Sequence, residues 1–207
     1  MLFFGLDNVL PYLISIVIAL SVHEFSHAYV AYRFGDPTAA RQGRLTLNPM
    51  AHLDLFGFLF ILVAGFGWAK PVPVNPYNFE NPKVASIATT AAGPLSNLLL
   101  AFIGMIVLML IIGSDLSNFF YVFVFVNLLL FVFNLLPFPP LDGYRITAEF
   151  LPRHTKSKIM QYEQYGMLAL MIIVITPLRE YTISPIFRTI IPGIIEIFRT
   201  ILSPLFL

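Results

Sequence analysis

The sequence contains two long apolar runs without a single acidic or basic residue, at 84–114 and 116–141. The hydrocarbon core of a bilayer is about 30 Å thick, and roughly 20 apolar residues cross it as an α-helix. Each run is therefore long enough to span a membrane. Composition agrees, because 58% of the 207 residues are hydrophobic and only 11% are charged, against about 25% charged in a soluble domain. The chain is predicted to be an all-α integral membrane protein.

Two further segments are candidate spans, at 9–32 and 159–177. The first is interrupted only by a cluster of polar residues, His23, Glu24 and His27, and the second contains Glu163 near its start. The tail at 181–207 is apolar but contains charged residues and prolines, so it either crosses the membrane or lies along its interface. We therefore predict about four to five transmembrane helices.

A shorter apolar segment, 55–69, lies between the first and second predicted spans. Runs of this length are more often re-entrant or interfacial than spanning. The residues that follow, 70–76, contain three prolines, which exclude a central strand but permit an edge strand or a hairpin. We predict a re-entrant segment with a β-hairpin at this point.

Basic residues predict the orientation of the chain. They follow the first and third long helices, whereas the turn at 113–118 has none; they are Arg33, Arg41, Arg44, Arg145, Arg153, Lys156 and Lys158. Because cytoplasmic loops carry an excess of Lys and Arg, these loops are predicted to face the cytoplasm and the turn to face outward. That orientation requires that 55–69 does not cross.

Composition also predicts the domain organisation and the partners. We expect one membrane-embedded domain over 1–207, with a core at 9–150 and C-terminal helices at 158–207, in the cell membrane with the lipid bilayer around it. A net charge of +1 gives no basic field for nucleic acid. The chain has no cysteine, which excludes thiolate metal sites, and the sequence does not specify an oligomeric state.

The segment His23-Glu24-Phe25-Ser26-His27 holds an H-E-x-x-H pattern. Residues four apart on a helix lie on one face, one turn apart, so both imidazoles can face one metal ion. In this pattern the two histidines bind zinc and the glutamate is a general base. A charged side chain inside a membrane helix costs about 2.5–3.5 kcal/mol. We therefore favour a bound cation over two structural histidines.

A catalytic zinc site needs a third protein ligand and an open position for water. Asp142 follows the third long helix after a proline-rich break. One alternative is that Asp142 caps the next helix. However, if 55–69 is re-entrant, Asp142 and the two histidines lie at the same cytoplasmic side. We therefore predict that His23, His27 and Asp142 bind one Zn²⁺ per chain.

Two amides lie in apolar sequence, and both are candidate site residues. Asn97 follows Gly93-Pro94, a helix-breaking pair, and is predicted to hold the substrate backbone or a developing oxyanion. Asn134 is predicted to orient Asp142 or a nearby loop. The simpler interpretation for both amides is interhelical hydrogen bonding, worth about 0.6–2 kcal/mol.

These motifs together resemble the site-2 protease family of intramembrane zinc metalloproteases, in a minimal form without a PDZ-like insert or a cystathionine-synthase-like regulatory domain. The matching motifs, in chain order, are His23-Glu24-x-x-His27, Gly93-Pro94-Leu95-Ser96-Asn97 and Asn134…Pro140-Leu141-Asp142-Gly143. The segments 43–49 and 68–74 are also similar to the family. The resemblance implies zinc held by the two histidines and the aspartate, Glu24 as the catalytic base, and a transmembrane protein as substrate.

The predicted function is hydrolysis of peptide bonds in or near transmembrane segments, at the cytoplasmic side, as in regulated intramembrane proteolysis. Lys70, Val72 and Val74 are predicted to pair with an unwound substrate segment by strand addition. The alternative is a membrane metal transporter or metal-binding protein with the same ligands, although 84–114 offers few polar groups for a transport path. A metalloprotease with a glutamate ligand is a further alternative, and its candidates are Glu149, Glu163 and Glu180.

Overall fold

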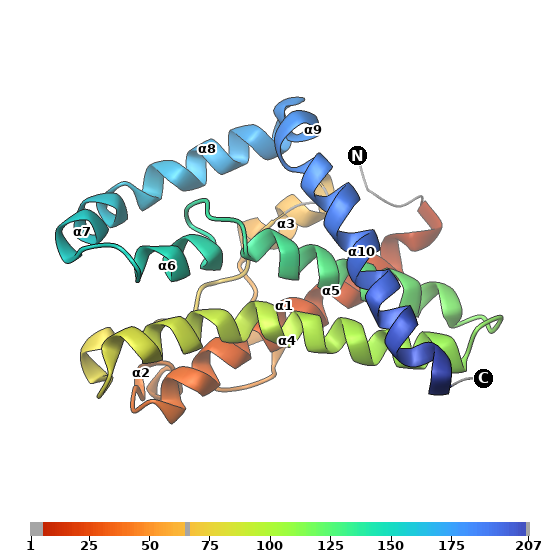
Figure 1. The fold of residues 1–207 in the computed structure, drawn as a ribbon, viewed down its shortest axis with the longest axis horizontal. Helices are drawn as coiled ribbons and strands as arrows, with labels where there is room; N and C mark the ends of the chain where they lie inside the picture. Colours follow the sequence, from red (N-terminus) through yellow and green to blue (C-terminus); the bar gives the residue numbers. More distant parts are fainter. Residues whose placement is uncertain (1–5, 65–66, 206–207) are drawn as a thin grey trace.

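The computed structural model describes residues 6–64 and 67–205, and the regular secondary structure in those residues is helical (Figure 1). The α-helices are α1 (Val9–Arg33), α2 (Thr38–Arg41), α3 (Leu55–Ala64), α4 (Pro82–Leu110), α5 (Ser117–Asn134), α6 (Asp142–Ala148), α7 (Arg153–Gln161), α8 (Glu163–Ile175), α9 (Leu178–Thr182) and α10 (Ser184–Leu202). Short 3₁₀ helices cover Leu6–Asn8, Pro49–Ala51, Pro76–Asn78 and Ser203–Leu205. The prediction of an all-helical membrane protein is confirmed at this level.

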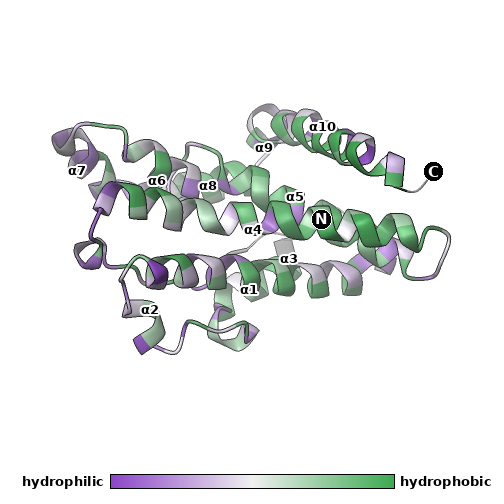
Figure 2. Cartoon of the chain, turned by 60° about the horizontal axis from the view of Figure 1, so that its bottom comes forward, coloured by the Kyte–Doolittle hydropathy of each residue, from purple (hydrophilic) through white to green (hydrophobic). Residues whose placement is uncertain are grey.

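Helices α1, α4 and α5 form the centre of the molecule and run side by side (Figure 1). Among the described residues these three are long and apolar enough to cross a membrane, as predicted for 9–32, 84–114 and 116–141. Large apolar side chains such as Leu95, Leu99 and Ile103 remain exposed on α4. Figure 2 shows apolar residues along the lengths of these helices and hydrophilic ones gathered near α2 and α7. Such an apolar exterior is typical of a surface that contacts lipid.

The chain leaves α1 and enters α4 at the same end of the bundle (Figure 1). Between these two points, α3 packs against α1 toward the other end, where Ile61 is buried in one cluster with Tyr12 and Ile16. Because α4 starts where α1 ends and α5 runs antiparallel to α4, the end of α1 and the end of α5 lie at the same end of the bundle.

The residues after α3 return along it at very close range. A Cβ atom on Gly57 would collide with the Trp68 backbone, and one on Gly67 would collide with the Gly57 backbone. In the part of the chain that the structure describes, strand pairing here is limited to one antiparallel bridge, Leu53–Ala69. The segment expected to form a hairpin is therefore α3 followed by an extended return, with no regular strand among its described residues.

The C-terminal helices differ from the single predicted helix at 159–177. The chain forms α7 and α8, separated at Tyr162, and α8 has 13 residues. At 1.5 Å per residue it is about 20 Å long, shorter than the bilayer core. Helix α10 lies across α4 and α5 and buries Ile191, Phe198 and Leu202 against them (Figure 1). The total of four to five spans stays a prediction.

Asp36, just after α1, forms hydrogen bonds both to the start of α2 and to the segment around Asn75. Its buried carboxylate accepts hydrogen bonds from the Thr38 backbone and hydroxyl, from the Asn75 N–H at 2.7 Å and from Asn78 Nδ2 at 2.6 Å. Burial alone would raise the pKa of Asp36, but these hydrogen bonds outweigh it and hold the pKa below its usual range. The extended segment before Asn75 is thereby fixed to the end of α1.

We expect Asp36→Asn to lower the free energy of unfolding at pH 7 by about 1–3 kcal/mol, since the negative charge is lost and one of the two accepting oxygens becomes an NH2 group that faces a donor. The pKa of Asp36 in the folded state lies below its unfolded value of about 3.9, so the stabilisation is complete above that value and disappears as the pH falls through the folded-state pKa. Denaturant unfolding of both proteins in detergent at pH 7 and near pH 3 measures this. An equal difference at both pH values would contradict it.

Candidate active site

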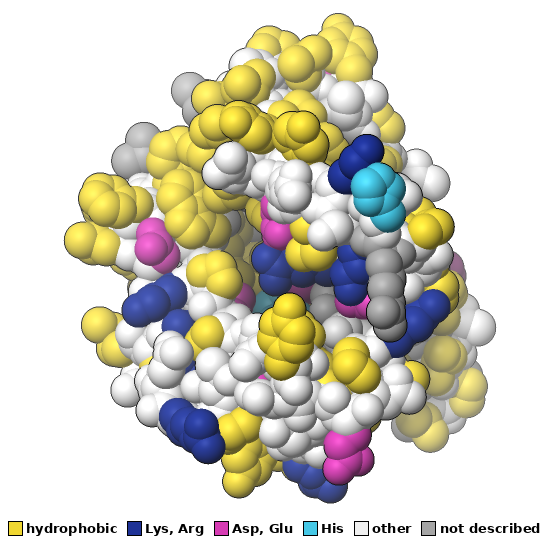
Figure 3. All heavy atoms as spheres, turned by 90° about the vertical axis from the view of Figure 1, so that its left-hand side faces the viewer, with side chains coloured by type: hydrophobic (Ala, Val, Ile, Leu, Met, Phe, Trp, Pro, Cys, Tyr) yellow, Lys and Arg dark blue, Asp and Glu magenta, His cyan; other side chains and the backbone are white. Residues whose placement is uncertain are grey.

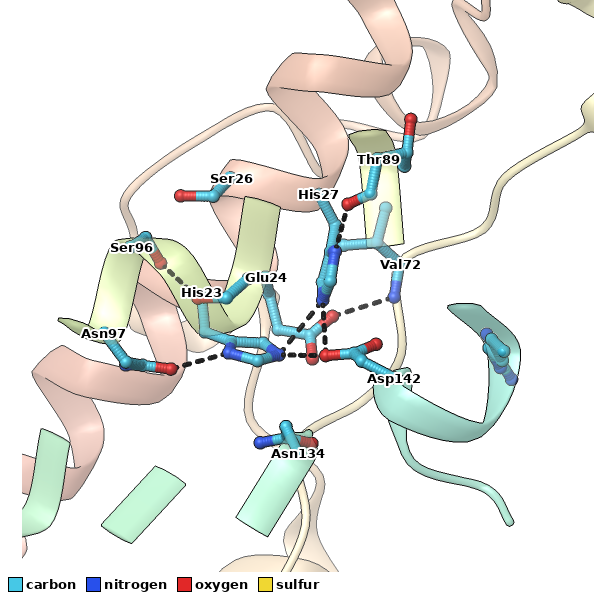
Figure 4. Close-up of polar contacts among 12 residues, drawn as sticks. His23, Glu24, Ser26, His27, Val72, Thr89, Ser96, Asn97, Asn134 and Asp142 are labelled. Atoms are coloured by element: carbon cyan, nitrogen blue, oxygen red, sulfur yellow. Dashed lines mark hydrogen bonds and ion pairs between the residues drawn. The ribbon is translucent and has the colours of Figure 1, made fainter. Parts of the chain in front are cut away.

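His23 and His27 lie on one face of α1, one turn apart, with their Nε2 atoms 3.0 Å from each other (Figure 4). His23 is 5% exposed. Ten residues separate it from the end of α1 at Arg33, which corresponds to about 15 Å along the helix. The pair therefore lies inside the bundle, nearer to the end that carries α2.

Asp142 approaches the two histidines from the first turn of α6. Its Oδ2 atom lies 3.2 Å from His23 Nε2 and 3.4 Å from His27 Nε2. Leu141 occupies the N-cap position of α6, so Asp142 does not have the capping role considered from the sequence. The three residues expected to bind one metal ion are together, although they come from two segments about 115 residues apart.

The other ring nitrogen of each histidine is held by α4 (Figure 4). His23 Nδ1 lies 2.7 Å from Asn97 Oδ1, and His27 Nδ1 lies 2.7 Å from the Thr89 carbonyl oxygen. Both partners are acceptors, so each Nδ1 carries the proton and donates it. In the neutral imidazole this arrangement leaves the lone pair on Nε2, which is the tautomer needed for metal binding.

Asn97 is fully buried, and its amide is entirely engaged by the protein. Its Nδ2 donates to the Ala19 carbonyl at 3.1 Å and to Asn127 Oδ1 at 3.2 Å, while its Oδ1 accepts from His23. Asn127 in turn donates to the Phe123 carbonyl. Of the two interpretations considered for Asn97, the described contacts are those of interhelical hydrogen bonding, from α4 to α1 and α5, and one of them is made to His23.

Gly93 is the point on α4 that faces both imidazoles. A Cβ atom there would lie 2.6 Å from His23 Nε2 and closer still to His27 Nε2. The absence of a side chain at residue 93 is therefore what lets α4 pack directly against the two rings.

The donor set fits a zinc ion. With bonds of 2.0–2.1 Å, two ligands of a tetrahedral zinc lie about 3.3 Å apart. The three separations between His23 Nε2, His27 Nε2 and Asp142 Oδ2 are 3.0, 3.2 and 3.4 Å. Asp142 Oδ2 is also buried without a hydrogen-bond partner in the described part of the chain. Two nitrogens and one carboxylate oxygen are the ligand types of catalytic zinc sites, which keep the fourth position open.

Glu24 lies beside this cluster without joining it. Its Oε2 accepts a hydrogen bond from the Val72 backbone N–H at 2.9 Å, and the residue is 9% exposed (Figure 4). The carboxylate therefore lies between the imidazoles of α1 and the extended segment after α3.

A cavity of about 1030 Å³ opens onto the cluster. Its lining includes Glu24, Val72, Val74 and Asn134, whereas the side chain of Lys70 is exposed to solvent and is not part of the lining. Asn134 donates to the Leu130 carbonyl at 3.0 Å, an ordinary contact within α5, and makes no hydrogen bond to Asp142 in the described structure. Figure 3 shows the end of the molecule that carries α2 and α7, where a hollow is surrounded by acidic and basic side chains.

The glutamates considered as alternative ligands are paired with basic residues. Glu149 pairs with Lys156, Glu163 with Arg145, and Glu180 with Arg188 and Arg179. All three glutamates lie outside the group of metal-binding atoms.

Several residues of the site were not identified from the sequence. Thr89 acts through its backbone carbonyl, which carries no signature in the side chain. Asn127, an amide in an apolar helix seven residues before Asn134, had the same signal as the two amides that were singled out. Arg44 lies in the segment 43–49, and its side chain contacts the Lys70 and Pro71 carbonyls, next to the Val72 N–H that binds Glu24.

Comparison with known proteins identifies the family. Residues 111–176 match peptidase family M50. The candidate zinc metalloprotease YwhC of Bacillus subtilis (strain 168) is 46% identical over 209 residues, covering 96% of this chain and 95% of that protein. The candidate zinc metalloprotease Rip2 of Mycolicibacterium smegmatis is 31% identical and MJ0611 of Methanocaldococcus jannaschii, of the same description, is 32% identical. The matches cover 78% and 67% of this chain, and 65% and 71% of those proteins.

No solved structure matches the chain. The similarity to YwhC extends over almost the whole of both proteins. The resemblance found in the sequence is therefore confirmed, and the chain belongs to peptidase family M50.

Proposed function

We propose that this chain is an intramembrane zinc metalloprotease in which His23, His27 and Asp142 hold one Zn²⁺ and Glu24 is the catalytic base. The observation that carries the assignment is the convergence of three ligand atoms on one point, with both histidines in the tautomer that leaves Nε2 free. Membership of a peptidase family favours proteolysis over the alternative of metal transport.

When bound, zinc supplies Lewis acidity that activates a water molecule and polarises a peptide carbonyl. Glu24 takes the proton of that water and later delivers it to the leaving amine. The Val72 N–H holds the Glu24 carboxylate beside the cluster during these transfers. Asn97 and the Thr89 carbonyl fix the orientation of the two imidazoles.

The substrate is a membrane protein whose transmembrane helix unwinds locally, because peptide bonds inside a helix are shielded. The cavity beside the cluster has room for such a segment, and Val72 and Val74 on its wall are suited to pair with it by strand addition. Pro71 and Pro73 have no N–H, and the N–H of Val72 is engaged by Glu24, so pairing uses the remaining carbonyls and the Val74 N–H.

The site faces the cytoplasm, and α3 with its extended return is re-entrant. The exposed basic residues near the ends of α1 and α6, Arg33, Arg41 and Arg145 among them, support this orientation. The start of α4 at the same end as the end of α1 supports the re-entrant course (Figure 1). The chain acts as one domain over 1–207, in which the core at 9–150 carries the chemistry and the helices at 158–207 complete the cavity.

We expect Glu24→Gln to keep its zinc and to lose turnover by about 10²–10⁴-fold, since only proton transfer is removed. Asp142→Asn is expected to purify with less zinc, because a neutral amide is a weaker ligand than a carboxylate. Metal content of the purified protein and cleavage of a single-span membrane protein measure the two effects separately. Native turnover in Glu24→Gln would rule out the assigned base.

We expect Gly93→Ala to weaken zinc binding by about 10- to 100-fold, because the new methyl group displaces the two imidazoles. The matched control is Gly193→Ala in α10, where a Cβ has no neighbour within 4 Å. Zinc affinity is measured by competition with a chelator. If both variants bind zinc equally, Gly93 does not shape the metal site.

The orientation can be tested with single cysteines, because the chain has none of its own. Gln42 directly follows α2, Ser114 lies in the turn between α4 and α5, and both are exposed. Helix α2 and that turn lie at opposite ends of the bundle (Figure 1). A membrane-impermeant maleimide is expected to label Ser114→Cys in intact cells, and Gln42→Cys only after permeabilisation. Labelling of Gln42→Cys in intact cells would reverse the assignment.

A further inference from the structure

Glu24 is contacted by the extended segment 70–75, which has no regular secondary structure of its own. Among the described residues, the hydrogen bond to Glu24 comes from the backbone N–H of Val72. Val72 lies between Pro71 and Pro73, in a stretch without helix or strand. Proline supplies no N–H, so this stretch lacks the backbone hydrogen bonds that fix regular structure.

Arg44 supports this stretch on the side before Val72, as Asp36 does after it through the Asn75 N–H. Its side chain is buried, at 6% exposed, and its guanidinium donates through Nη2 to the Lys70 carbonyl at 2.5 Å and through Nη1 to the Pro71 carbonyl at 3.3 Å. The Lys70 N–H is held separately by the His52 carbonyl at 2.7 Å. One planar fork therefore binds two consecutive carbonyls directly before Val72.

The Pro71 carbonyl and the Val72 N–H belong to one peptide group. That group is planar, and in the trans form its oxygen and its hydrogen point in opposite directions. Arg44 contacts the oxygen and Glu24 contacts the hydrogen. The peptide therefore connects a guanidinium to a carboxylate, and each charge polarises the group in the direction that strengthens the other contact.

We propose that Arg44 is a positioning residue for Glu24, acting through the Pro71–Val72 peptide. This inference rests on the proposed role of Glu24 as the catalytic base. Arg44 touches neither the metal-binding atoms nor the cavity. Its removal leaves the zinc ligands in place but lets the peptide rotate, so that Glu24 loses its fixed orientation.

We expect Arg44→Gln to lower kcat by about 10- to 100-fold, since misplacement by 1 Å of a reacting group costs about 100-fold. Zinc content is expected to stay at the native level and KM to change little, because neither ligands nor substrate contacts are removed. Arg44→Lys keeps the charge but reaches only one carbonyl, and its kcat is expected to lie in between. The control is Arg41→Gln, an exposed arginine of the same loop, with native kinetics.

The link through the peptide is tested at Val72. Val72→Pro removes the N–H, whereas Val72→Ala shortens the side chain and keeps it. We expect kcat of Val72→Pro to fall below that of Val72→Ala by about the factor seen for Arg44→Gln, and the double variant Arg44→Gln/Val72→Pro to be no slower than the slower single variant.

Native kcat in Arg44→Gln would overturn the inference, as would equal kcat in Val72→Pro and Val72→Ala, or multiplied effects in the double variant. If Arg44→Gln does not fold, the comparison of the two Val72 variants decides alone. Failure of the proposed function has a different signature, which is native turnover in Glu24→Gln.

Discussion

The structure depends on the requirement that polar groups inside a membrane-spanning helix find partners within the protein. Helix α1 carries two imidazoles and a carboxylate over five residues, and such groups are costly within a bilayer unless the protein supplies partners for them. Each group has a defined partner: α4 takes both Nδ1–H groups, α6 supplies Asp142 opposite both Nε2 atoms, and the extended segment after α3 supplies an N–H to Glu24. The packing of three separate segments around this face of α1 follows from this requirement.

The sequence predicted the parts of this arrangement that depend on local features, such as the length of an apolar run or the spacing of two residues on a helix. Long apolar runs identify α1, α4 and α5, because crossing a bilayer imposes a length and a composition. The i, i+4 spacing of His23 and His27 places both rings on one face, because helix geometry alone decides that. Asp142 followed from a topological argument, and its position depends on the chain returning to the same end of the bundle before α4.

Other features arise from tertiary contacts and had no local pattern. Asn97 was recognisable as a costly amide, but its partner depends on which face of α4 meets α1. The Thr89 contact uses a backbone carbonyl, which every residue possesses. The predicted helix at 159–177 is divided at Tyr162, and Gly166 in the second part packs so closely on Pro139 that a Cβ there would collide with it. Lys70 was predicted to pair with a substrate by strand addition, yet its N–H is bound by the His52 carbonyl and its carbonyl by Arg44.

The amides of Asn97 and Asn127 form a chain of hydrogen bonds that runs in one direction through the bundle. An amide has an accepting end and a donating end, so a row of amides has a polarity. Asn127 turns its nitrogen to the Phe123 carbonyl, its oxygen therefore meets the nitrogen of Asn97, and the oxygen of Asn97 is left for His23. Helix α5 provides no atom to the metal-binding cluster, yet the direction in which its Asn127 side chain lies, acting through Asn97 of α4, decides which nitrogen of the His23 imidazole is free to bind a cation.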